Sequence, residues 1–121
     1  MKLRHLMLEF PRENEAIQNL IDFFNDARLK KRTLSVSFDR LFDIAHPSSA
    51  ANLTKILQGL ITIDIVRQVY RVEYEPGIGS ENYSTIAEIP KIVYDRNGLE
   101  VIPDLTNTKA YYIFPGSYVN F

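Results

Sequence analysis

The fold is decided by residues 33–83, which read TLSVSFDRLFDIAHPSSAANLTKILQGLITIDIVRQVYRVEYEPGIGSENY. The first half of this stretch contains two apolar repeats with helical spacing, separated by Pro47. From Ile65 the pattern changes to an alternation of apolar and charged residues, which is typical of a half-exposed strand. We therefore expect two helices, a strand, a turn at residues 76–80 and a second strand within Tyr83–Ile89.

Serine residues mark the beginning of both predicted helices. Ser37 precedes the first helix, and Ser48 or Ser49 precedes the second. A serine at this position caps a helix because its side chain accepts a hydrogen bond from a free N–H group of the first turn. The apolar positions of the two helices are Phe38, Leu41, Phe42 and Ala45, and then Ala50, Leu53, Ile56, Leu57 and Leu60. The turn between the helices has about three residues, the length that a helix-turn-helix requires.

On either side of this stretch the sequence predicts further elements. A helix from about Asn14 to Lys31 follows Pro11, and its apolar positions are Ile17, Leu20, Ile21 and Phe24. Downstream, Asn97-Gly98 lies between apolar runs and predicts a hairpin. Another β-prone run covers Ala110–Phe114. The expected fold class is therefore α+β, in a single domain over residues 1–121.

Composition limits the class of protein. The chain has 121 residues, 45% of them apolar and 24% charged, which is typical of a folded globular domain. It contains no cysteine, which excludes disulfides, thiolate metal sites and a cysteine nucleophile. The apolar run at the N-terminus is interrupted by His5 and Glu9 and is a poor signal peptide. We expect a cytoplasmic protein with no membrane segment.

Charge is unevenly distributed along the chain. Residues 1–72 hold 11 Lys/Arg and 8 Asp/Glu, whereas residues 73–121 hold 3 Lys/Arg and 7 Asp/Glu, so that the net charge is −1. Proteins dedicated to nucleic-acid binding carry a clear basic excess, since neutralisation of phosphates supplies most of their non-specific affinity. Here the basic excess is slight and confined to the first part.

The predicted elements resemble those of the winged helix-turn-helix superfamily. Leu53, Leu57 and Leu60 resemble the leucines of the third helix in that family, and Ile65-Val66 with Tyr70-Arg71-Val72 resembles its passage into the wing. The resemblance covers roughly residues 14–89. It implies a three-helix core with an antiparallel β wing, to which residues 90–121 add a β-rich extension. It also implies that the third helix enters the major groove of DNA.

A nucleic-acid site would use the exposed face of that helix together with neighbouring cations. Asn and Gln side chains read adenine edges, and Lys contacts guanine or phosphate. The candidate residues are Ser49, Asn52, Lys55, Gln58, Arg67, Arg71, Lys30, Lys31 and Arg32. The alternative for the cations is a solvated helix end at residues 28–32 and cross-strand pairing for Arg67 and Arg71.

Aromatic residues gather at the C-terminus and admit two interpretations. They are Tyr111, Tyr112, Phe114, Tyr118 and Phe121. They either close the core of the domain or form an exposed edge that pairs with a partner chain, because aromatic side chains are enriched at interface centres.

No catalytic motif is present. His46 has serines nearby but no nucleophile elbow, and Glu73 and Glu75 lack further metal ligands at recognisable spacing. We therefore expect no catalytic residue, cofactor, metal or small-molecule substrate. The expected function is a non-enzymatic binding module that acts through protein–protein contacts in a larger assembly, with a protein partner or a second copy of the chain. The alternative is a transcriptional regulator that reads duplex DNA with the third helix.

Overall fold

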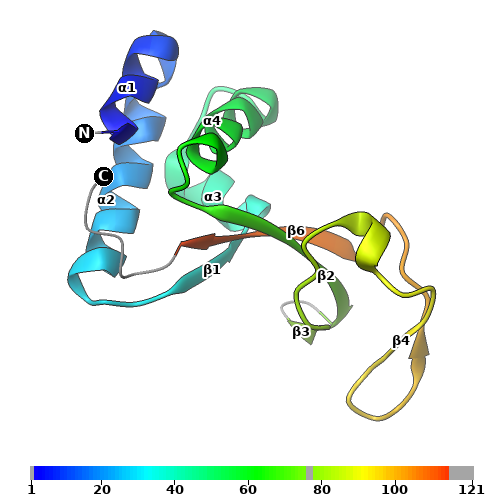
Figure 1. The fold of residues 1–121 in the computed structure, drawn as a ribbon. Helices are drawn as coiled ribbons and strands as arrows, with labels where there is room; N and C mark the ends of the chain where they lie inside the picture. Colours follow the sequence, from blue (N-terminus) through cyan, green and yellow to red (C-terminus); the bar gives the residue numbers. More distant parts are fainter. Residues whose placement is uncertain (1, 76–77, 115–121) are drawn as a thin grey trace. The chain divides into compact units, whose positions relative to one another are not determined.

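The computed structural model describes residues 2–75 and 78–114, and these form a mixed α+β structure (Figure 1). Its helices are α1 (Lys2–Glu9), α2 (Asn14–Leu29), α3 (Phe38–Ala45) and α4 (Ala50–Thr62), with 3-10 turns η1 (Pro11–Glu13) and η2 (Ile86–Glu88). Its strands are β1 (Leu34–Ser37), β2 (Arg67–Glu75), β3 (Ile78–Gly79), β4 (Val93–Tyr94), β5 (Glu100–Val101) and β6 (Thr108–Phe114). The expected α+β class is confirmed.

The strands form two sheets, one with the order β1-β6-β2-β3 and one with the order β4-β5. By the density of its contacts the chain divides into two compact units. The helical unit consists of residues 1–67 and 112–121, and the β unit consists of residues 68–111. The expectation of a single domain stays a prediction.

Helix caps set the boundaries within the helical unit. Ser37 and Ser49 are the N-caps of α3 and α4, and their side chains accept hydrogen bonds from the backbone N–H groups of Arg40 and Asn52. These caps confirm the predicted helix starts. His46 ends α3 in the left-handed region, with φ 54°, immediately before Pro47.

The core of the helical unit is built from most of the apolar positions that the sequence indicates, although Ala50 is exposed and Phe38 and Phe42 are half-buried. In α2 and α4 these side chains are buried: Ile17, Leu20, Ile21, Phe24, Leu53, Ile56, Leu57 and Leu60. Phe114 on β6 is fully buried and stacks on Phe24, with ring centroids 4.8 Å apart. The last strand is therefore fixed to α2 by an aromatic pair.

Helix α1 was not predicted, and it packs on both α2 and α4. Gly59 of α4 permits a close approach to Leu6 of α1, since a Cβ atom at position 59 would lie 2.7 Å from Leu6 Cδ2. Leu6 is buried, whereas Leu8 is largely exposed. The short apolar run at the N-terminus thus lies in a helix that buries Leu6 against α4.

The predicted second wing strand within Tyr83–Ile89 is wrong. Tyr83 forms only an isolated antiparallel bridge with Tyr70, and residues 86–88 are the 3-10 turn η2. The strand that follows β2 directly is the short β3, whose register with β2 shifts between Glu73 and Glu75. Such a bulge bends the strand and ends regular pairing.

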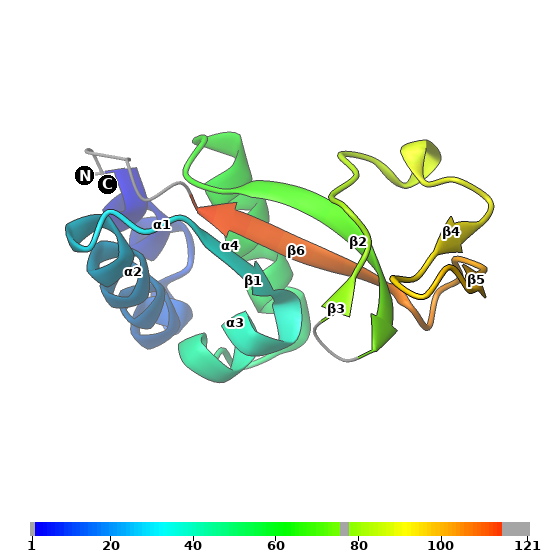
Figure 2. The ribbon, with the colours of Figure 1, turned by 90° about the horizontal axis from the view of Figure 1, so that it is seen from below.

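The predicted hairpin around Asn97-Gly98 is confirmed. Val93 pairs with Val101 and Tyr94 pairs with Glu100 (Figure 2). Gly98 has φ 79°, a conformation that side chains with a Cβ atom rarely adopt. The Asp95 carboxylate accepts hydrogen bonds from the Asn97 and Leu99 backbone N–H groups, at 2.8 and 3.0 Å, and closes the turn.

Replacing Phe114 with alanine will test the aromatic pair. We expect Phe114→Ala to lower the free energy of unfolding by about 3–5 kcal/mol, because the substitution leaves a cavity against Phe24. Leu29→Ala, at a side chain that is 68% exposed, is the control and should change it by less than about 0.5 kcal/mol. Denaturant unfolding measures both. A loss below about 1 kcal/mol for Phe114→Ala would show that the pair does not hold β6 in place.

Candidate interaction site

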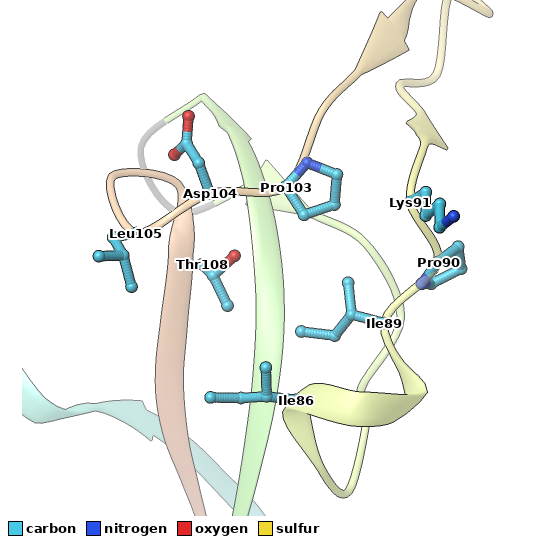
Figure 3. A pocket seen from close by; sticks show the side chains of 8 residues that line it. All are labelled: Ile86, Ile89, Pro90, Lys91, Pro103, Asp104, Leu105 and Thr108. Atoms are coloured by element: carbon cyan, nitrogen blue, oxygen red, sulfur yellow. The ribbon is translucent and has the colours of Figure 1, made fainter.

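The β unit contains an open pocket of about 350 Å³ with a largely apolar lining. Figure 3 shows Ile86 and Ile89 pointing toward Thr108 of β6, with Pro103 at the edge of the pocket. The lining residues are Ile86, Ile89, Pro90, Lys91, Pro103, Asp104, Leu105 and Thr108. A concave apolar pocket with few polar groups is the usual form of a binding site.

Local hydrogen bonds hold both walls of this pocket. On one wall, the Ser84 backbone N–H donates to the Glu88 carboxylate at 3.2 Å and closes the turn that carries Ile86. On the other wall, the Asp104 carboxylate accepts from the Thr106 hydroxyl and backbone N–H, at 2.6 and 2.8 Å. These bonds, the Thr106 hydroxyl first, lower the pKa of Asp104. Asp104 is therefore charged at neutral pH, and its Oδ1 atom already accepts hydrogen bonds from Thr106.

Exposed apolar side chains concentrate around the same segment. Of the nine large apolar side chains that the described residues leave exposed, six lie between Ile86 and Leu105. They are Ile86, Ile92, Tyr94, Leu99, Ile102 and Leu105, with Leu105 at 96% exposure. Single exposed apolar residues are ordinary, but a concentration of them marks an interaction surface. We name the pocket and these six residues the 86–108 surface.

Sequence reasoning missed the 86–108 surface. The available signal was a pair of Ile-Pro dipeptides, Ile89-Pro90 and Ile102-Pro103, on either side of the predicted hairpin. Proline lacks the N–H group that a sheet requires, so the flanking segments cannot extend the hairpin strands. Their isoleucines are left at the surface or around the pocket.

The candidate residues on α4 are only partly available for DNA. Lys55 and Gln58 are exposed, as expected. Ser49 is the helix N-cap, with its hydroxyl accepting from the Asn52 backbone. The Asn52 side chain is not free, because its amide donates to Glu13 Oε1 at 2.9 Å. The expectation that Asn52 points outward is therefore wrong.

Glu13 is a buried carboxylate at the N-terminus of α4, and its exposed fraction is 4%. It accepts hydrogen bonds from the Ser48 hydroxyl, from the Ser48 backbone N–H at 3.3 Å, and from the Asn52 amide. The Ser48 hydroxyl bond is the largest cause that lowers the pKa of Glu13, and burial opposes it. Glu13 therefore stays ionised. It accepts a hydrogen bond from the Ser48 backbone N–H just before α4, and its negative charge lies at the N-terminal end of that helix.

The expected cations differ in their availability. Lys30 lies 3.2 Å from Asp26 in an exposed pair, whereas Lys31, Arg32 and Arg67 are exposed. Arg71 donates to the Asn82 side chain and lies 4.3 Å from the centre of the Tyr111 ring. Arg71 is thus engaged within the β unit.

The aromatic residues that the structure describes are interior. Tyr111, Tyr112 and Phe114 are buried, which agrees with the interpretation that they close the core of the domain. Burial is the main cause that raises the pKa of Tyr111, with Glu73 contributing in the same direction. Strand β6 lies between β1 and β2 in the sheet order and is not an edge. Tyr118 and Phe121 lie outside the described residues.

Comparison of the chain with protein-family models, with curated proteins and with solved structures finds no match. Within residues 2–75 and 78–114, no helix has the length and apolar character needed to cross a bilayer. The same residues contain no group of three or more metal-ligating side chains placed to hold an ion. The site must therefore be interpreted from its own geometry.

Stability at low pH will test the Glu13 cluster. Because folding lowers the pKa of Glu13, its contribution is complete above its ordinary value of 4.5 and is lost as the pH falls through the folded value. We expect Glu13→Gln to lower the free energy of unfolding by about 1–3 kcal/mol at neutral pH. The difference from the native protein should shrink below pH 4.5.

The control for this experiment is Glu15→Gln, at an exposed position in the first turn of α2. Denaturant unfolding of the three proteins between neutral pH and about pH 3 gives the comparison. A Glu13→Gln deficit that persists unchanged at the acidic end would contradict the ionised cluster.

Proposed function

We propose that the chain is a non-enzymatic, winged-helix-like binding module that acts in the cytoplasm through protein–protein contacts in a larger assembly. The observation that carries this proposal is the concentration of exposed apolar side chains on the 86–108 surface. Apolar patches of this kind mark sites that another protein covers. The occupant is a partner protein or a second copy of the chain.

The winged-helix part of the proposal is supported by the order of elements. A helix, a strand, two helices separated by a short turn and a further strand follow one another as α2, β1, α3, α4 and β2. We assign β6 as the strand that completes the wing, because it lies beside β2 in the sheet order. The winged-helix-like core then covers residues 14–114, and the 86–108 surface belongs to a long insertion in the wing.

The chemistry of the pocket fits an apolar anchor from a protein. Interfaces derive most of their energy from a few buried side chains in well-formed pockets, surrounded by weaker contacts. Here Ile86 and Ile89 provide one apolar wall, and Pro103 and Leu105 provide the other. The Oδ1 atom of Asp104 is already held by Thr106 and Asn107, so the hydrogen bonds of this atom are kept when an apolar side chain enters the pocket.

The DNA-binding alternative has weaker support. Its recognition face retains Lys55 and Gln58 but loses the Asn52 amide to Glu13. The buried Glu13 carboxylate also places a negative charge at the N-terminus of α4, where a phosphate would otherwise be favoured. Arg71 is engaged with Asn82 and Tyr111. Of the proposed set, Lys30, Lys31, Arg32, Lys55 and Arg67 remain as exposed cations, and Lys30 pairs with Asp26.

Substitutions at the 86–108 surface test the protein-binding proposal. We expect Ile86→Asp and Leu105→Asp to weaken binding of the captured partner by at least about 30-fold, as for an interface hot spot. A charge in an apolar contact is desolvated without a counterion, so the loss should be large. The native chain is used to isolate the partner, and the dissociation constant is then measured with both purified proteins.

Leu29→Asp is the matched control, because Leu29 is 68% exposed and lies in the helical unit. It should bind as the native chain does. Circular dichroism and thermal unfolding establish that all variants are folded. Equal binding by native chain, Ile86→Asp and Leu105→Asp would disprove a role for this surface.

A salt series with random-sequence duplex DNA tests the alternative. We expect a dissociation constant no lower than that of non-specific complexes, which is about 10⁻⁴–10⁻⁶ M. The Lys55→Ala and Arg67→Ala variants should change this constant little. Fluorescence anisotropy gives the dissociation constant at each salt concentration. A steep salt slope together with loss of binding in both variants would favour the DNA-binding regulator and count against a purely protein-binding module.

A further inference from the structure

A second hollow, of about 490 Å³, lies in the helical unit beside strand β1. Its lining comes from α2, from residues 32–36 and from α3: Phe23, Asp26, Ala27, Arg32, Thr33, Leu34, Ser35, Val36 and Arg40. None of the described lining residues belongs to β6. The hollow therefore opens away from the strand with which β1 is paired.

Strand β1 is an edge of its sheet. It stands first in the order β1-β6-β2-β3, so β6 is its one strand neighbour among the described residues (Figure 2). An edge strand presents N–H and C=O groups with the spacing of a further strand. Strand β1 has four residues, and because successive residues direct their backbone groups to opposite edges, it offers the groups of alternate residues to a short extended segment.

Arginines stand at both ends of β1, and each is positioned by a helix boundary. Lys31 adopts φ 52° after α2, and the Arg32 backbone N–H then donates to Ala27 O at 2.9 Å, which fixes Arg32 before the strand. Arg40 lies in the first turn of α3, where its backbone N–H donates to the Ser37 cap. Thus backbone hydrogen bonds hold the chain at both ends of β1, next to the two arginines.

The charge of this hollow is positive. Its single acidic lining residue, Asp26, lies 3.2 Å from the Lys30 ammonium. Arg32 and Arg40 are exposed, and the ion pairs found among the described residues involve neither of them. A guanidinium binds a carboxylate through two parallel hydrogen bonds, which makes arginine well suited to acidic side chains.

We propose that β1 and its two flanking arginines form a docking edge for an extended acidic segment of a partner protein. The segment adds as a strand to β1, and its carboxylates pair with Arg32 and Arg40. A nucleic-acid strand could contact the same cations, but it has no backbone N–H and C=O groups to pair with β1. An acidic peptide can pair with the strand and contact both arginines. This docking edge is separate from the 86–108 surface and uses different chemistry.

A displayed library of random peptides of about ten residues, selected against the full chain, tests the proposal. We expect enrichment of β-prone peptides with acidic residues. A synthetic enriched peptide should bind at least about five-fold more weakly to Arg32→Ala and to Arg40→Ala, in line with about 1 kcal/mol for each ion pair. Arg12→Ala, at an exposed arginine of η1, should bind as the native chain does.

Two further measurements separate strand addition from simple charge attraction. The same peptide with N-methyl groups on alternate backbone amides should lose binding, because it cannot donate to the edge. A single-stranded oligonucleotide should not displace the peptide, and Ile86→Asp should leave peptide binding unchanged. Enrichment without acidic residues, no enrichment, undiminished binding of the N-methylated peptide, or displacement by the oligonucleotide would each overturn the proposal.

Discussion

The stacking of Phe114 on Phe24 is the interaction on which the arrangement of the helical unit most depends. Both rings are fully buried, and their centroids are 4.8 Å apart. An aromatic pair of this kind contributes apolar burial and a specific geometry. It joins the last described strand to an early helix, so the entropy of closing a long loop is offset by one well-packed contact. Strand β1 can pair with β6 only when β6 is held there.

The difference between local contacts and contacts between distant residues explains how much of the fold could be predicted from sequence. Ser37, Ser49 and the apolar repeats of α3 and α4 act within a few residues of themselves, and the predicted boundaries hold. The second wing strand failed because strand pairing is decided by distant residues. Tyr83 meets Tyr70 at one bridge, on the edge of β2 with which β3 also pairs, but the chain then turns into η2 and leaves that edge. Strand β6 lies on the other side of β2. Local pattern does not reveal where that pairing ends.

The candidate site shows the same division between local and distant effects. Asn52 has the side chain and the helical position of a base-reading residue, and sequence alone predicts that it faces solvent. Glu13, from the turn before α2, contacts it and takes its amide. A buried carboxylate needs several donors to remain ionised, and Ser48 with Asn52 supplies them. The N-terminal end of α4 is thereby packed against Glu13, and it is no longer available to bind an anion such as a phosphate.

The number of available charges supports the proposal of a protein partner over the DNA-binding alternative. The helical unit carries ten Lys/Arg and eight Asp/Glu, a net charge of +2, and the β unit carries four and seven, a net charge of −3. A protein that contacts about six to ten phosphates binds DNA with a steep dependence on salt, because each contact adds about 0.9 to the salt slope. The exposed cations proposed for DNA, Lys30, Lys31, Arg32, Lys55 and Arg67, give at most about five such contacts. An acidic peptide at the β1 edge needs only the two arginines beside that strand. An apolar side chain at the 86–108 surface needs no cation. The exposed cations of the chain are therefore sufficient for both proposed surfaces.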